Sequence, residues 1–352
     1  MLEFIRREKI YFLILFFILA VNLMQVKTVK KETPSEKSLS SMNFEELGVT
    51  EEKVKDFFES DKFSAKFFKY LVYFGFFIFA LSLVLNLVFI FRGKPRLCRP
   101  GLNPAYRDGV EIGRKGAGAP WEILDIFRAV LIIIFAGYVL AIIEAYVVKS
   151  FHLELTMNLR MIINTFFIDI VAAMVILYFV MVKYKKNIQE LGLKTSSFLR
   201  NILSGITAYI FMLPVLLVIL IFSIWILNAL GYTPPPQPVF EVFMEEKKSL
   251  VLLFLTVFVS VLGPIVEEVF FRGFMYSAVR KHTGVLAAAF LSGAIFSMLH
   301  TNIVGFLPIM ALGVLLAYLY ETTGSLVASI SVHILHNSII VAFVFFLKEL
   351  IG

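Results

Sequence analysis

Polar side chains that can transfer protons or donate hydrogen bonds are concentrated in the last hundred residues of an otherwise apolar chain. They are Glu267, Glu268, Arg272, His300, His333, His336 and Asn337. A charge at the centre of a bilayer costs about 2.5–3.5 kcal/mol on insertion scales, so ionisable residues inside apolar runs indicate function. Glutamate and histidine are the side chains most often used as general acids and bases. The sequence therefore predicts an acid–base site in the C-terminal region.

The spacing of these residues predicts which of them share a helix face. Glu268 and Arg272 are four residues apart and can pair, and so can His333 and Asn337. Glu267 and Glu268 project about 100° apart, so we expect that they do not face the same point. An arginine partner favours an ionised carboxylate, whereas an unpaired carboxyl group in apolar surroundings is held closer to its neutral form. We interpret Glu267 as a general base and the Glu268–Arg272 pair as a structural brace, although the opposite assignment also fits the spacing.

Helix geometry predicts that the candidate residues lie at similar depths in the membrane. At about 1.5 Å per residue, Glu267 lies about 20 Å from the cytoplasmic end of its helix, His300 about 24 Å and His333 about 14 Å. Allowing for helix tilt, we expect the three side chains to converge on one cavity inside the bilayer.

Two further patterns fit a polar cavity between closely packed helices. Pro264 lacks an N–H, so we expect it to kink its helix and to leave the Ser260 carbonyl without a donor. Such a defect persists in a membrane only where protein or water satisfies the freed group. On the next apolar run, Ala289, Gly293 and Ser297 recur every four residues, a pattern that allows close helix approach.

The composition excludes a soluble enzyme. Of the 352 residues, 59% are hydrophobic and 17% charged, against roughly 45–50% and about 25% in soluble domains. The single cysteine, Cys98, excludes a disulfide-stapled scaffold, and its basic loop predicts a free thiol. The net charge of +7 resides in short loops between apolar runs, which indicates membrane orientation and not nucleic-acid binding.

Apolar runs long enough to cross a bilayer, about 20 residues each, follow one another along the chain. They lie near 10–26, 67–91, 125–148, 158–182, 202–230, 249–280, 285–301, 303–320 and 325–348. The pattern predicts an all-α, multi-pass protein of the cell membrane with about 8–9 transmembrane helices. The basic segments fall on one side of alternating helices, so we expect a cytoplasmic N-terminus and an external C-terminus.

The polar segments divide the chain into two predicted regions. Residues 1–150 form an accessory membrane region with three transmembrane helices and a polar loop at 27–66, in which we expect a short amphipathic helix. Residues 151–352 form the region that carries the chemistry. Segment 184–201 suits an interfacial helix, and Pro234–Pro236 marks an external loop. Glu144 and Asp169 belong to no motif, and we expect interhelical or interfacial contacts there.

The ordered set of motifs resembles a known family. Glu267-Glu268-x-x-x-Arg272, Phe296-x-x-x-His300 and His333-x-x-x-Asn337 occur in this order on successive apolar runs. They resemble the CPBP family, the CAAX proteases and bacteriocin-processing enzymes, also called the Abi family of intramembrane proteases. Leu191-Gly192-Leu193 and Tyr320-Glu321-x-x-Gly324-Ser325-Leu326 are similar as well, so the resemblance covers roughly residues 185–348.

The resemblance implies an intramembrane endopeptidase that needs no metal and no cofactor. By position, Glu267 and His300 would activate a water, while His333 and Asn337 would stabilise the oxyanion. His336 has no counterpart in the family pattern and is either a bystander or an auxiliary hydrogen-bonding group. The implied partners are the lipid bilayer and a membrane-associated peptide or protein, prenylated or not. The resemblance implies no nucleic-acid partner, and the sequence leaves the oligomeric state open.

Three alternatives remain open at this point. Two histidines and a carboxylate suit a catalytic zinc, although the sequence lacks His-Glu-x-x-His. A transporter could use the glutamates and histidines as a proton relay, although no internal repeat is evident. A non-catalytic immunity or scaffold protein could also retain these residues. Metal analysis, flux measurements and alanine substitution of Glu267 and His300 would separate these alternatives.

Overall fold

The computed structural model describes residues 8–26, 49–92, 119–194, 197–232 and 238–351, and every regular element in these ranges is helical. Seven helices are long and apolar enough to cross a membrane, and two shorter apolar helices cover Lys9–Asn22 and Val285–Leu299. The prediction of an all-α, multi-pass membrane protein is confirmed. Segments 27–48 and 93–118, with Cys98 in the latter, and Pro234–Pro236 lie outside the described residues.

The chain forms two compact units, which we call unit 1 (residues 1–37 and 119–188) and unit 2 (residues 38–118 and 189–352). Unit 1 contains α2 (Lys9–Val26), α5 (Ile123–Ser150) and α6 (Met157–Leu177), which is followed by a π-helical turn, Tyr178–Lys183. Unit 2 contains α3 (Glu51–Glu59), α4 (Phe63–Arg92), α7 (Phe198–Ala229), α8 (Pro238–Glu245), α9 (Ser249–Val257), α10 (Gly263–Glu268), α11 (Ser277–Thr283), α12 (Val285–Leu299), α13 (Phe306–Thr323) and α14 (Leu326–Ile351).

Buried ion pairs join the helices of unit 1. Asp125, at the start of α5, accepts hydrogen bonds from Arg128 at 2.7 Å, from Lys183 and from Tyr184. Arg128 also pairs with Glu8, just before α2. Each charge in this buried network has a partner of opposite sign, which is the condition under which charges are tolerated in an apolar environment.

A second ion pair in unit 1 joins α5 to α6. Glu144 accepts a hydrogen bond from the Arg160 Nε at 2.5 Å and another from the Arg160 Nη2 at 2.8 Å. The interhelical contact predicted for Glu144 is therefore confirmed.

Helix α4 joins unit 2 through hydrogen bonds to the backbone of α7. Pro214 lies inside α7 and cannot donate to the carbonyl of Ile210, four residues earlier. The Ser82 hydroxyl donates to that carbonyl at 2.5 Å, and the Asn86 amide donates to the Phe211 carbonyl at 3.0 Å. The compact units therefore do not follow the predicted division at residue 150, because polar side chains tie α4 to the C-terminal helices.

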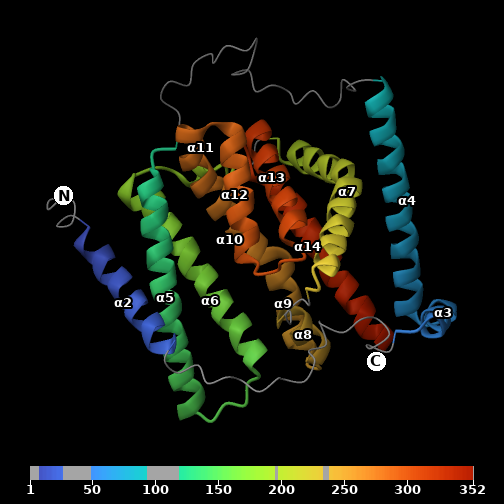
Figure 1. Cartoon of the computed structure of the whole chain (residues 1–352), viewed down its shortest axis with the longest axis horizontal. Helices are drawn as coiled ribbons and strands as arrows, with labels where there is room; N and C mark the ends of the chain where they lie inside the picture. Colours follow the sequence, from blue (N-terminus) through green and yellow to red (C-terminus); the bar gives the residue numbers. More distant parts are fainter. Residues whose placement is uncertain (1–7, 27–48, 93–118, 195–196, 233–237, 352) are drawn as a thin grey trace. The chain divides into compact units, whose positions relative to one another are not determined.

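Helices α12 and α13 form a tightly packed hairpin, visible side by side in Figure 1. A Cβ added to Gly293 would lie 2.9 Å from the Met310 carbonyl oxygen, and one added to Gly313 would lie 2.8 Å from the Gly293 Cα. Ala289 and Ser297 are buried on the same helix. The predicted close approach at the small residues is confirmed. Helix α12 has only 15 residues.

The segment before α7 binds the turn between α13 and α14. The Leu326 amide donates to the Gly192 carbonyl at 2.8 Å, and the Tyr320 hydroxyl donates to the Leu191 carbonyl at 3.2 Å. Gly192 has a φ of +94°, and a Cβ there would lie 2.5 Å from the Tyr320 ring. The interfacial helix predicted for 184–201 is wrong for the described residues. In place of an interfacial helix there is a short 3₁₀ turn, Ile188–Leu191. The Leu191 and Gly192 carbonyls at its end accept the hydrogen bonds from Tyr320 and Leu326.

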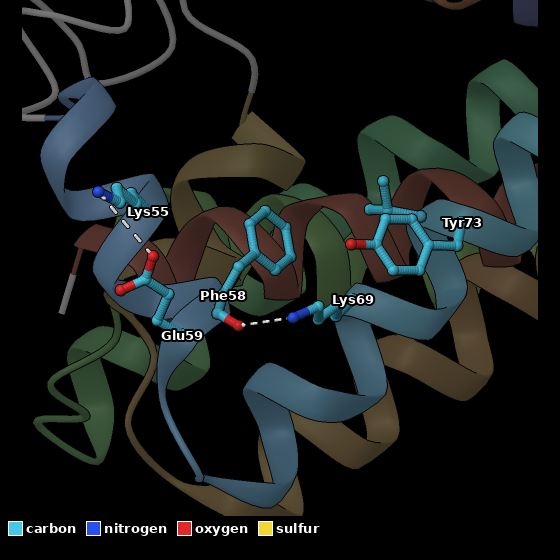
Figure 2. A pocket seen from close by; sticks show the side chains of 6 residues that line it. Lys55, Phe58, Glu59, Lys69 and Tyr73 are labelled. Carbon is cyan, nitrogen blue, oxygen red and sulfur yellow. Dashed lines mark hydrogen bonds and ion pairs between the residues drawn. The ribbon is translucent and has the colours of Figure 1, made fainter.

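Helix α3 is the short amphipathic helix expected in the polar segment 27–66, of which the structure describes residues 49–66. Thr50 caps it by accepting from the Lys53 amide, and the Phe58 ring stacks on Phe346 with centroids 5.7 Å apart. The Lys69 ammonium donates to the Phe58 carbonyl at 3.3 Å, as the dashed line in Figure 2 marks. A hollow of about 250 Å³ lies beside this contact, lined by residues of α3 and α4. These contacts fix α3 against both α4 and α14.

Candidate active site

The helix that carries both glutamates is irregular at the site. Residues 249–283 form one continuous span in which α9, α10 and α11 are separated by π-helical turns at Phe258–Leu262 and Val269–Tyr276. Such π-helical turns occur frequently at functional sites, since they redirect side chains within a helix. Here the second turn begins directly after Glu268.

Glu268 and Arg272 form a fully buried ion pair. The Arg272 Nη1 lies 2.5 Å from the Glu268 Oε1, and neither side chain is exposed. The Arg272 Nη2 also donates to the Gly313 carbonyl at 3.1 Å, and the guanidinium lies 4.6 Å from the centre of the Phe296 ring. The pairing predicted from the four-residue spacing is confirmed, and it connects the helix to the α12–α13 hairpin.

His333, on α14, lies between the two glutamates. Its Nδ1 is 3.0 Å from the Glu268 Oε1, and its Nε2 is 3.6 Å from the Glu267 Oε2. The prediction that Glu267 and Glu268 cannot face one point is therefore wrong. Both side chains are long, and a single imidazole inserted between them meets one carboxylate at each nitrogen.

The orientation of His333 sets its chemistry. A ring nitrogen that faces a carboxylate oxygen at hydrogen-bond distance carries the proton, so Glu268 fixes Nδ1 as a donor. The Nε2 then accepts a hydrogen bond when the ring is neutral and donates one when the ring is charged. The Glu268–Arg272 pair thus orients His333 with its reactive nitrogen toward Glu267.

Glu267 differs from Glu268 in its surroundings. Its side chain is 32% exposed, whereas that of Glu268 is fully buried. Within the described residues, neither the Glu267 Oε2 nor the Glu268 Oε2 has a hydrogen-bond partner, and both atoms are buried. Because 3.6 Å exceeds hydrogen-bond distance, the Glu267 Oε2 keeps an unused acceptor position beside the His333 Nε2. Two adjacent carboxyl groups in unlike surroundings are typical of divided acid and base roles.

His300 reaches the same cluster through Phe296. It lies at the exposed end of α12, with its Nδ1 2.8 Å from the Phe296 carbonyl oxygen. The Phe296 ring contacts both His300 and His333, with centroid distances of 4.6 and 5.4 Å. In the described part of the chain no hydrogen bond joins His300 to Glu267, so their joint action stays a prediction.

Asn337 binds the backbone of the helix that carries the glutamates. Its Nδ2 donates to the Val259 carbonyl at 2.9 Å. In the first π-helical turn the Gly263 amide bonds to the carbonyl five residues earlier, so in this register Pro264 fails to donate to Val259. The prediction that Ser260 loses its donor is therefore wrong by one residue, because the helix is π and not α at this point.

His336 and Ser260 extend the polar set. The Tyr209 hydroxyl lies 2.9 Å from the His336 Nδ1, which joins α7 to α14 and fits the auxiliary hydrogen-bonding group that we considered for His336. The Ser260 hydroxyl is buried and has no hydrogen-bond partner in the part of the chain that the structure describes. Sequence reasoning missed Tyr209 and Ser260, although each is a polar group within an apolar run.

The described residues contain no group of three or more histidine, cysteine, aspartate or glutamate side chains arranged to hold a metal ion. The absence of a metal requirement stays a prediction, which metal analysis of the active protein can check.

Comparisons with known proteins match the region that forms this site. Residues 249–339 match the family described as "Type II CAAX prenyl endopeptidase Rce1-like". The chain is also 32% identical over 82 residues to a Bacillus subtilis (strain 168) protein named "Putative membrane peptidase YdiL". That alignment covers 23% of this chain and 34% of the relative, so the chain spans about a third of the relative's length. No solved structure matches the chain significantly.

The matched range includes all seven named residues of the three motifs, from Glu267 to Asn337. It also includes the helices α9 to α13 and the part of α14 that holds His333. These matches support the predicted resemblance of this C-terminal region to the CPBP family of CAAX proteases and bacteriocin-processing enzymes.

Proposed function

We propose that the protein is an intramembrane endopeptidase that hydrolyses a peptide bond of a membrane-associated peptide or protein. The observation that carries this proposal is the free Glu267 Oε2, 3.6 Å from the His333 Nε2. Its neighbour Glu268 is locked by Arg272. A partly exposed carboxylate beside an oriented imidazole is suited to proton transfer, and structural packing alone does not require it.

In this proposal Glu267, assisted by His300, removes a proton from a water. The water oxygen attacks the scissile carbonyl carbon, the carbon–nitrogen bond breaks, and the proton passes to the leaving amine. His333, with its ring in the charged form, donates a hydrogen bond through Nε2 to the oxyanion that forms on the carbonyl oxygen. Asn337 uses one N–H for Val259 and keeps a second N–H for this oxyanion.

The Glu268–Arg272 pair is a positioning element in this mechanism. It fixes the His333 ring and adds no proton acceptor of its own, since both oxygens lie in a fully buried site beside a guanidinium. The Phe296 ring keeps His300 and His333 on one side of the cluster. The proposed site thus separates a reactive carboxylate from a structural one.

The experiment that tests this function compares membrane proteomes of cells that contain wild-type protein or Glu267→Gln. We expect new peptide termini to appear only with the wild-type protein, because an amide cannot accept the proton from water. Glu190→Gln changes an exposed carboxylate and serves as the matched control, with cleavage retained. Equal cleavage by folded Glu267→Gln would refute the role of Glu267. Solute flux in proteoliposomes without cleavage would favour the transporter.

A further inference from the structure

Residues 189–194, where the chain leaves unit 1 and enters the second part of unit 2, are held in place through their backbone. Three of their carbonyls accept hydrogen bonds from the region where α13 ends and α14 begins, and these carbonyls belong to Leu191, Gly192 and Lys194. Backbone outside a regular helix needs such partners wherever water is scarce. The mechanism proposed above gives this segment no role.

The 189–194 segment packs directly against the π-helical turn that carries Arg272. Gly273 follows Arg272, and a Cβ added to Gly273 would lie 3.0 Å from the Leu191 carbonyl oxygen and 3.3 Å from the Leu191 Cβ. Leu191 and Arg272 are both fully buried. Only a glycine allows two backbones to approach this closely, so a shift of Leu191 would displace the residue next to Arg272.

Two hydroxyls add a hydrogen-bonded route from this segment to the Arg272 backbone. The Tyr320 hydroxyl donates to the Leu191 carbonyl at 3.2 Å and lies 3.3 Å from the Ser277 hydroxyl. The Ser277 hydroxyl in turn lies 3.2 Å from the Arg272 carbonyl, to which it can donate. Each hydroxyl has one proton, so the two groups make at most two of these three hydrogen bonds at one time. The contact between Tyr320 and Leu191 therefore affects the hydrogen bond at the Arg272 backbone.

Arg272 connects this constraint to the reactive cluster. Its guanidinium pairs with Glu268 at 2.5 Å, and the Glu268 Oε1 lies 3.0 Å from the His333 Nδ1. The opposite ring nitrogen faces Glu267 at 3.6 Å. Every step from the 189–194 segment to Glu267 is thus a close contact within unit 2. Coupling between distant groups is carried by contiguous networks of this kind.

Neighbouring contacts already fasten α13 to the helix that carries Arg272. Glu321 accepts from the Tyr276 hydroxyl at 3.0 Å and pairs with Arg280 at 2.7 Å. These bonds join side chains and do not involve the Arg272 backbone. The Tyr320 hydroxyl instead binds a main-chain carbonyl, so it constrains the position of the backbone itself. Attachment of the helices alone does not account for this contact.

We propose that the 189–194 segment positions the active site, with Tyr320 and Gly273 as positioning residues. The segment holds Arg272 in place and thereby sets the direction in which the His333 ring points. The inference rests on the proposed peptidase function for its effect on the reaction rate. The surroundings of the His333 ring can be measured without cleavage.

The test uses two variants of the full chain in phosphatidylcholine nanodiscs. Tyr320→Phe removes the hydroxyl that binds Leu191, and Gly273→Ala forces Leu191 and the π-helical turn apart. Two matched controls make the same changes away from the site. Tyr70→Phe removes a hydroxyl from a ring that is 70% exposed, and Gly75→Ala adds a Cβ with no atom within 4 Å.

The first readout is the nuclear magnetic resonance signal of the His333 ring N–H in protein that contains isotope-labelled histidine. Loss of the signal in His333→Gln assigns it. We expect its chemical shift to change in Tyr320→Phe and Gly273→Ala, because the hydrogen bond to the carboxylate of Glu268 is altered. Both controls should keep the wild-type shift. A contact that only stabilises the fold would lower the unfolding midpoint without moving this signal.

The second readout is the steady-state rate of cleavage of a peptide identified in the comparison of membrane proteomes. We expect kcat to fall at least tenfold in Tyr320→Phe and in Gly273→Ala, with KM changed less than twofold. A misdirected imidazole weakens interactions made in the transition state more than those made with the bound substrate. Both controls should stay within twofold of the wild-type kcat.

An unchanged His333 signal in folded Tyr320→Phe and Gly273→Ala would overturn the inference, and so would equal changes in the two controls. If either variant fails to fold, Ser277→Ala replaces it. This half-buried helical position accommodates alanine, and the change removes the donor to the Arg272 carbonyl. Cleavage that persists in Glu267→Gln would refute the proposed function, while the His333 signal would still decide whether the segment positions the ring.

Discussion

At the scale of single residues, His333 organises the candidate site. It is almost completely buried, and its two ring nitrogens face different carboxylates. One carboxylate is fully buried and paired with Arg272, and the other is 32% exposed. This asymmetry gives one imidazole a fixed side and a reactive side, which the spacing of Glu267 and Glu268 alone does not reveal.

A double substitution at Asn337 and Pro264 separates structure from catalysis. Asn337→Leu removes the donor to the Val259 carbonyl, and leaving that buried group unsatisfied should cost about 1–3 kcal/mol of unfolding free energy. Pro264→Ala restores a backbone N–H and should return part of that stability. Loss of an oxyanion donor typically lowers kcat by about 10²–10³, so the double variant should stay slow.

The measurements are the detergent concentration at half-unfolding and the rate of cleavage of a peptide identified in the comparison of membrane proteomes. Pro264→Ala alone is the control for changes in helix bending. If the double variant recovered both stability and rate, Asn337 would have a structural role only.

The polar residues of the site could be predicted from sequence because each is a polar group in an apolar run, where its burial costs free energy. The detailed geometry of the site could not be predicted. The shift of the free carbonyl from Ser260 to Val259 depends on a π-helical turn, and no residue pattern used here distinguishes π from α. The partnership of Tyr209 with His336 joins residues 127 positions apart, which periodicity within one helix does not report.

At the scale of elements, the α12–α13 hairpin holds Arg272 and His300 in place. The two helices meet at Gly293 and Gly313, and the Gly313 carbonyl accepts from Arg272. Because the two helices contact each other through backbone atoms at these glycines, neither position has room for a side chain. The packing of this hairpin and the orientation of the buried ion pair are therefore linked.

Gly313→Ala tests this link. The new Cβ would lie 2.8 Å from the Gly293 Cα and 3.4 Å from the Arg272 Nη2, so one helix must move. We expect a loss of about 1–3 kcal/mol in unfolding free energy, measured by detergent unfolding, together with slower cleavage. Gly75→Ala in α4 has no atom within 4 Å of the new Cβ and should be neutral or slightly stabilising. Equal losses of unfolding free energy in Gly313→Ala and Gly75→Ala would mean that helix propensity, and not the close contact between α12 and α13, determines the effect.

Most spans could be predicted from apolar length, including the close packing at Ala289, Gly293 and Ser297. The segment before α7 could not, because its conformation is decided by a partner. Its carbonyls bond to Tyr320 and Leu326, and this tertiary contact outweighs the local amphipathic pattern that favours an interfacial helix.

At the scale of the whole molecule, contacts within unit 2 sort its segments into two ends. At one end, Gly192 bonds to Leu326, and Arg280 pairs with Glu321 at 2.7 Å. At the other, Lys348 donates to the Phe243 carbonyl at 2.9 Å. This sorting agrees with the alternation of spans that the basic loops predict.

Cysteine labelling checks the direction of this alternation. In a Cys98→Ser background, Lys247→Cys should react with a membrane-impermeant maleimide in intact cells. Lys281→Cys should react only after permeabilisation. Both lysines are exposed in the structure, so a difference in labelling reflects the side of the membrane and not burial. The reverse pattern would place the N-terminus outside.

The grouping of helices into units could not be predicted, since it depends on where polar side chains find partners. Ser82 and Asn86 tie α4 to α7, although α4 precedes the accessory helices α5 and α6 in the chain. Apolar runs report that a helix spans the membrane but not which neighbour it meets.

The shortness of α12 has a consequence for the surrounding lipid. Fifteen residues extend about 22 Å, whereas the hydrocarbon core is about 30 Å thick. If α12 alone crosses the bilayer, the lipids next to it must shorten or tilt to meet its end, which would make the bilayer thinnest beside His300. A transmembrane substrate that diffuses to this place loses hydrocarbon cover for part of its length. A helical segment of such a substrate would therefore be most easily unwound beside His300.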